Sequence, residues 1–253
     1  MKEFSKVRVG AVSYLNTRPL VYGFEQGMMK DVIQLVSDYP SRIADHLLND
    51  EIDVGLVPVA ILPALKESHI ISNFCIGCSG PVASVCIFSE VPIEKIERLY
   101  LDYQSRSSVA LTRVLLREYW KVEPELIDAP ENFTNLIKGT TAALVIGDRA
   151  LKQRLLSSFI YDLGEAWIAH TRLPFVFAAW ISNKKLDENF ITAFNHANGE
   201  GFKHIREIIG ANPFPSYDLN EYYTKNIDYR FDEQKRKGLK LFVSKLPSFE
   251  LTR

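Results

Sequence analysis

A polar run of three serines and one arginine, Ser105, Arg106, Ser107 and Ser108, has the residue types of an anion-binding site. It precedes an apolar pattern with helical spacing over residues 109–119, so it stands where a helix should begin. Free backbone N–H groups, the helix dipole and a guanidinium all favour an anion there. A carboxylate suits the run better than a pyrophosphate, because no glycine-rich loop accompanies it. The alternative interpretation is an ordinary serine N-cap beside a solvated arginine.

A second polar pair, Asn16 and Thr17, follows a β-branched run at residues 7–13. In open α/β sheets, ligands bind at the carboxyl ends of strands, which is where this pair would lie. Both side chains can donate and accept hydrogen bonds. The structural alternative is an Asx turn before Pro19.

Two further candidates are associated with predicted strands. Ser84 lies in the strand-like segment 82–88, after a glycine-containing turn, and Asp148 follows the strand-like segment 142–146. Either side chain could contact a ligand. Ser84 could instead be a small residue that fills a tight space, and Asp148 could cap the next helix.

The elements that would position these residues alternate between strands and helices, which predicts an α/β protein with parallel strands and crossover helices. From residue 186 onward the pattern is helical. Helices are predicted at residues 40–48, 93–99 and 105–119, and strands at residues 7–13, 32–36, 52–57, 70–76, 82–88, 99–102, 124–127, 142–146 and 173–180.

The composition limits the possible functions. A length of 253 residues allows one large domain or two modest ones, and a net charge of −1 provides no basic surface for nucleic acid. No apolar run is long enough to cross a membrane, and the charged start lacks a signal-peptide core, so a cytoplasmic location is expected. The spacing of Cys75 and Cys78 could belong to a metal or redox half-site, but no second pair completes it; buried apolar roles are favoured.

Seven motifs occur in order along the chain, at residues 10–20, 53–58, 79–85, 101–108, 146–151, 161–164 and 173–180. Taken together, they make the chain similar to the chorismate dehydratase family of the futalosine route to menaquinone. Ser107 stands where the family usually has threonine, and Arg172 stands where glycine commonly precedes Leu-Pro-Phe. Arg172 would add a side chain near the cleft.

The resemblance implies a two-lobe, periplasmic-binding-protein-like (type II) fold with a ligand cleft between the lobes. Lobe I would comprise residues 1–87 and 178–253, and lobe II residues 88–177. Two crossing strands, near residues 82–88 and 175–181, would form the hinge. Phe175 and Phe177, two residues apart, would share one face of the second of these strands.

The implied activity is loss of water from chorismate to give 3-[(1-carboxyvinyl)oxy]benzoate. The resemblance implies no cofactor and no metal. The expected partner is the small-molecule substrate chorismate, and no binding to nucleic acid or to a membrane is expected. The oligomeric state stays open. The expected catalytic residues are Asn16 and Ser84, and the expected substrate-binding residues are Thr17, Ser105, Arg106, Ser107, Ser108, Asp148 and Phe175.

The matched motifs contain no histidine or glutamate that could serve as an obvious general base. An amide is a very weak base, so our hypothesis is that Asn16 orients the substrate while the enolpyruvyl carboxylate of chorismate removes the C3 proton. The helix start at Ser105–Ser108 would stabilise the charge that spreads into the ring carboxylate. Asp148, while ionised, would avoid direct contact with a carboxylate.

Three alternatives remain from the sequence alone. The same fold could bind a small acid without chemistry, since fold does not fix function. The related dihydroxynaphthoate synthase is another possibility, although Tyr14-Leu-Asn-Thr17 replaces its Pro-Asn-Asp-type opening. A purely structural protein would leave the serine run without a ligand.

Overall fold

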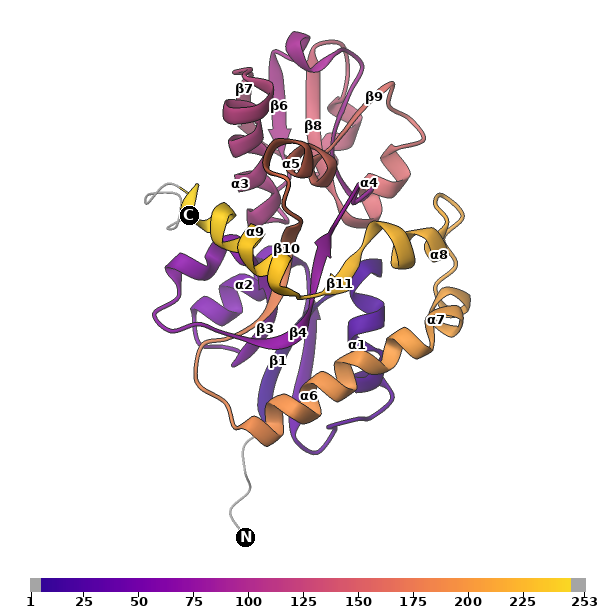
Figure 1. Ribbon diagram of the computed structural model, residues 1–253. Coiled ribbons are helices and arrows are strands. Elements are labelled where there is room, and N and C mark those ends of the chain that lie inside the picture. Colours follow the sequence, from indigo (N-terminus) through magenta and orange to yellow (C-terminus); the bar gives the residue numbers. More distant parts are fainter. Residues whose placement is uncertain (1–5, 247–253) are drawn as a thin grey trace.

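The computed structural model describes residues 6–246 and contains two mixed β-sheets, one above the other in Figure 1. The six-stranded first sheet contains, from edge to edge, β11 (Asp228–Arg230), β4 (His69–Cys78), β10 (Phe175–Ser182), β3 (Val54–Pro58), β1 (Val7–Val12) and β2 (Ile33–Asp38). The five-stranded second sheet contains β7 (Glu125–Asp128), β6 (Arg98–Leu101), β8 (Thr141–Ile146), β5 (Val85–Ser89) and β9 (Phe159–Asp162).

The pairing is parallel only in part. β1 runs parallel to β2 and β3, and β6 runs parallel to β7 and β8, as the alternating pattern predicts. β10 is antiparallel to both of its neighbours, and so is β5. The reason is the path of the chain. β5 and β10 are each the first strand after the chain has passed from one sheet to the other, so no crossover helix within one sheet connects them to the preceding strand.

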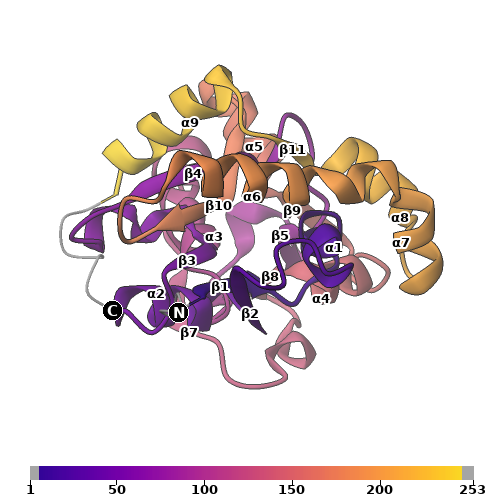
Figure 2. The same ribbon diagram turned by 90° about the horizontal axis from the view of Figure 1, so that it is seen from below.

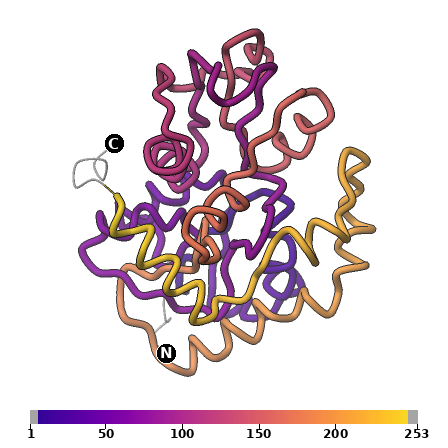
Figure 3. Tube along the Cα trace, turned by 45° about the horizontal axis from the view of Figure 1, so that its top comes forward, coloured from indigo at the N-terminus to yellow at the C-terminus, as the bar shows by residue number. Residues whose placement is uncertain are grey.

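The chain moves from the first sheet to the second between β4 and β5, and it returns between β9 and β10. Figure 3 shows the passage from the indigo and purple part to the magenta part and back, after which the orange and yellow segment stays with the first sheet. The lobe boundaries at residues 87/88 and 177/178 stay a prediction. Residues 1–5 and 247–253, assigned above to lobe I, lie outside the described residues.

Helices cover the sheets, and Figure 2 shows α6 crossing in front of the first sheet. None of the helices within residues 6–246 is long and apolar enough to cross a membrane. The segment after residue 186 is mainly helical, but it also holds the short strand β11, which the helical pattern concealed. The helices are α1 (Arg18–Glu25), α2 (Pro40–Leu48), α3 (Arg106–Leu115), α4 (Gly147–Gln153), α5 (Leu163–Thr171), α6 (Glu188–Glu200), α7 (Ile205–Ala211), α8 (Leu219–Glu221) and α9 (Glu233–Ser244).

Arg172 ends α5 in the left-handed region, with φ of 63°. Its backbone N–H donates to the carbonyl of Ile168, and its side chain is exposed. Helices commonly end on a left-handed residue, and glycine is favoured there because it has no Cβ. This geometry explains why glycine suits the position.

Replacing Arg172 with glycine is therefore expected to stabilise the fold by about 1 kcal/mol, since the left-handed conformation costs an ordinary residue about 1–2 kcal/mol. Urea unfolding measures the change, and Arg172→Ala is the matched control because it removes the side chain but keeps Cβ. Equal stability of the two variants would contradict the backbone explanation.

Candidate active site

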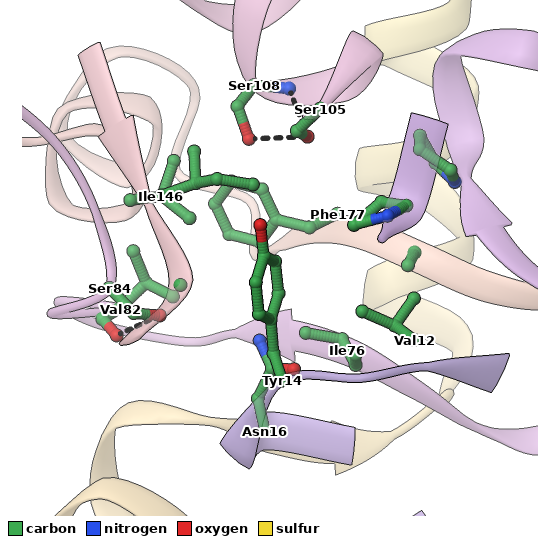
Figure 4. Close-up of a pocket in the computed structure, with 15 residues that line it drawn as sticks. Val12, Tyr14, Asn16, Ile76, Val82, Ser84, Ser105, Ser108, Ile146 and Phe177 are labelled. Carbon is green, nitrogen blue, oxygen red and sulfur yellow. Dashed lines mark hydrogen bonds between the residues drawn. The ribbon is translucent and has the colours of Figure 1, made fainter. Parts of the chain in front are cut away.

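A pocket lies where the first sheet meets the segments that lead into the second, and it encloses about 450 Å³ including its opening to solvent (Figure 4). Its walls are mainly apolar with a few polar groups, as in sites for small organic ligands. The lining residues are Val12, Tyr14, Asn16, Pro40, Pro58, Ile76, Val82, Ser84, Val85, Ser105, Ser108, Ile146, Gly147, Phe177 and Ala178.

Ser105 and Ser108 form the helix-start part of the pocket. Ser105 is the N-cap of α3, in extended conformation, and its Oγ accepts a hydrogen bond from the Ser108 N–H at 3.3 Å. The two hydroxyls lie 2.9 Å apart, and both side chains are buried in the pocket wall (Figure 4). The capping role and the pocket position therefore coexist, and a carboxylate could bind here.

Ser107 and Arg106 have different surroundings from their two neighbours. Ser107 Oγ accepts the backbone N–H of Ala60 at 3.1 Å, from the 3₁₀ turn Val59–Ala64 after β3. Arg106 pairs with Asp45 of α2 at 2.6 Å. Neither is among the lining residues, and the two contacts join the start of α3 to α2 and to the turn after β3.

We expect Arg106→Ala and Asp45→Ala to lower kcat/KM equally and by less than about threefold, because partly exposed ion pairs contribute only about 0–1 kcal/mol. Steady-state kinetics of both variants, with the substrate proposed below, measures this. A tenfold rise in KM for Arg106→Ala alone would show instead that the guanidinium binds substrate, as the sequence suggested.

Asn16 lies in the 3₁₀ turn Leu15–Thr17, directly after β1, and lines the pocket. The Thr17 hydroxyl donates to Asn16 Oδ1 at 3.3 Å, and the Tyr229 hydroxyl donates to the Asn16 backbone carbonyl at 2.8 Å. Thr17 itself is fully buried and is not among the lining residues. Its contact orients the amide that faces the pocket.

Ser84 lies in the passage from β4 to β5, fully buried in the pocket wall. Its N–H donates to the Val82 carbonyl at 2.7 Å, and the residue between them, Ala83, has φ of 62°. This tight turn holds a non-glycine residue in a strained conformation. Asp162 supports the turn, because its carboxylate accepts the N–H groups of Val82 at 3.0 Å and Ala83 at 2.7 Å.

Asp148 lies in the first turn of α4 and is not among the lining residues. Its carboxylate accepts the Leu15 N–H at 3.1 Å, so it holds the turn that carries Asn16. Burial raises the pKa of Asp148, while that hydrogen bond and the charge of Arg18 act in the opposite direction.

Phe175 is fully buried against Trp167 and Phe242, with ring centroids 5.2 and 4.8 Å away. It is not among the lining residues; Phe177, two residues further along β10, is. The sequence placed both on one face, and their rings do meet at 4.6 Å. The distance along the strand decides which ring reaches the pocket.

Sequence reasoning missed a network built on Tyr14, whose ring crosses the pocket in Figure 4 and whose hydroxyl donates to Gln104 Oε1. Arg149 also donates to that oxygen, at 2.8 Å, and pairs with the fully buried Asp102 at 2.7 Å. Burial raises the pKa of Tyr14, so its phenol is neutral at physiological pH. The only signal in the sequence that could have indicated this network is the position of Tyr14 within one of the matched motifs.

The structure gives no sign of a metal centre in the part of the chain that it describes. Between residues 6 and 246, no group of three or more His, Cys, Asp or Glu side chains could hold a metal ion. Cys75, Cys78 and Cys86 are buried and free, and burial raises the pKa of all three thiols.

These two sheets, with a pocket where the chain passes between them, define an α/β protein of the periplasmic-binding-protein type. A protein of Archaeoglobus fulgidus has the same fold (TM-score 0.75, 15% identity, covering 95% of this chain and 96% of that one). So does the periplasmic aliphatic sulphonate binding protein of Escherichia coli (TM-score 0.59, 15% identity, covering 95% and 92%).

The chain belongs to the menaquinone biosynthesis family, whose sequence profile matches residues 7–247. It is also 26% identical over 265 aligned positions to the chorismate dehydratase of Thermus thermophilus, and the alignment covers 94% of each chain. The two-sheet α/β fold and the family expected from the sequence are thereby confirmed.

Proposed function

We propose that this protein is a chorismate dehydratase, which eliminates water from chorismate to give 3-[(1-carboxyvinyl)oxy]benzoate. Its family and its likeness to the Thermus thermophilus enzyme support this reaction. The observation that carries the proposal is the joint lining of one pocket by Ser105, Ser108, Asn16 and Ser84. The apolar walls suit a ring, and the helix start suits a carboxylate.

The ring carboxylate of chorismate binds at the start of α3. The buried hydroxyls of Ser105 and Ser108 and the free N–H groups there donate charge-assisted hydrogen bonds. When the C3 proton leaves, negative charge spreads through the ring into this carboxylate. Donors already held in place by the helix stabilise that charge without reorganisation.

The base is the substrate's own enolpyruvyl carboxylate. Tyr14 is the sole ionisable group among the lining residues, and its raised pKa keeps it protonated. Asn16 orients the substrate so that its carboxylate reaches the C3 hydrogen. The C4–O bond then breaks, the departing oxygen takes the proton held by the enolpyruvyl carboxyl group, and water leaves as the ring becomes aromatic.

Incubation of the purified protein with chorismate tests the proposal. We expect the aromatic product and water in equal amounts, identified by chromatography and mass spectrometry, with a heat-denatured sample as control. Saturable binding of chorismate without product would identify a carboxylate-binding protein instead. If the protein neither binds chorismate nor forms a product from it, chorismate is not its substrate.

A further inference from the structure

Tyr222 lies directly behind the pocket wall, although it is not itself among the lining residues. It begins the helical turn Tyr222–Asn226 after α8, and its side chain is fully buried. Its hydroxyl donates a hydrogen bond to Ser84 Oγ at 2.8 Å. The contact joins residues 138 positions apart in the sequence, so no local pattern could have revealed it.

The environment of the Tyr222 hydroxyl keeps it protonated. Burial raises the pKa of Tyr222 far above its usual range, while the hydrogen bond with Ser84 acts in the opposite direction. The phenol therefore stays protonated and remains a donor. One buried hydroxyl thus donates to Ser84, a side chain that the sequence analysis expected to be catalytic.

This contact determines what Ser84 can do. A hydroxyl has one hydrogen to donate and two lone pairs to accept with. Tyr222 occupies one lone pair of Ser84 Oγ, and the Ser84 hydrogen has the Val82 carbonyl as its acceptor at 3.5 Å, which is the limit for a hydrogen bond. A ligand oxygen in the pocket would be a better acceptor, and the donor behind Ser84 would strengthen that bond.

We propose that Tyr222 is a positioning residue that holds Ser84 as the hydrogen-bond donor to the C4 oxygen that leaves the substrate. The inference rests on the proposed function. No proton passes through Tyr222: the C3 proton goes to the enolpyruvyl carboxylate and from there to the departing oxygen, which Ser84 stabilises as the C–O bond breaks.

A double-mutant cycle tests this role, with kcat and KM for chorismate measured for Ser84→Ala, Tyr222→Phe and the double variant. Phenylalanine keeps the buried ring and removes only the hydroxyl. We expect Tyr222→Phe to lower kcat about tenfold to a hundredfold, as for the loss of one buried hydrogen bond, with KM changed less than about threefold. In the Ser84→Ala background the same change should cost less than about twofold, because residues that act as one unit are non-additive.

Tyr217→Phe is the matched control. Its hydroxyl donates to Asn226 at 3.1 Å and its ring lies 6.1 Å from that of Tyr222, but it touches neither Ser84 nor Asn16 in the described contacts. It should keep wild-type kcat and a thermal midpoint like that of Tyr222→Phe. Wild-type kcat in Tyr222→Phe, or a full additive loss in the double variant, would overturn the positioning role alone. Absence of product from the wild-type protein would overturn the proposed function, and this inference with it.

Discussion

Ser108→Asp should raise the KM for chorismate by about 100-fold or more, while Ser108→Asn, which has nearly the same shape, should raise it far less. Ser108 is 1% exposed, lines the pocket and lies in the first turn of α3. Two like charges about 4 Å apart repel by about 4 kcal/mol at an effective dielectric constant of 20. A carboxylate at this position would therefore oppose the substrate carboxylate.

The substitution is suited to the test because aspartate is favourable near a helix N-terminus. The fold should survive, and thermal unfolding of both variants checks that it does. Lowering the pH should restore part of the affinity of Ser108→Asp, since the introduced carboxyl group becomes neutral when it is protonated. The asparagine variant should show no such recovery.

Equal KM values for the aspartate and asparagine variants would mean that no carboxylate binds at this helix start. Steric change is common to both variants, so the difference between them reports charge alone. Product inhibition measured with 3-[(1-carboxyvinyl)oxy]benzoate provides an independent measure, because the product keeps both carboxylates.

Local sequence was sufficient for the features that local physics determines. The serine N-cap at residue 105 was predictable, because a polar run followed by helical spacing defines the start of α3. The strand that precedes Asn16 and the strand that follows Ser84 were predictable from their β-branched residues. Which residues share a pocket, however, came from the family resemblance rather than from periodicity.

The rest depends on long-range contacts that no local pattern encodes. Four adjacent polar residues looked equivalent, yet Ser105 and Ser108 line the pocket while Arg106 and Ser107 contact α2 and the turn after β3. Helical geometry separates them, since successive side chains point about 100° apart. The contact of Tyr222 with Ser84 was likewise not predictable, because the sequence pattern of its segment indicated only a helix.

Replacing the enolpyruvyl carboxylate of chorismate with its methyl ester should reduce turnover by the wild-type protein to below about 1%. The ester keeps the ring, the C4 hydroxyl and the carboxylate expected at Ser108, but it cannot accept the C3 proton. General-base catalysis typically contributes about 10²–10⁴-fold, which sets the size of the expected loss. Single-turnover measurements at saturating ester separate the chemical step from weaker binding.

The Asn16→Ala variant, measured with both chorismate and the methyl ester, tests the role of the Asn16 side chain. It should lower kcat for chorismate about 100-fold, because a small misplacement of the reacting groups costs about that much. It should have little further effect on the ester, which has already lost its base. Rapid turnover of the ester by the wild-type protein, abolished in Asn16→Ala, would instead make Asn16 the group that handles the proton, and the carboxylate of the substrate would then have only a binding role.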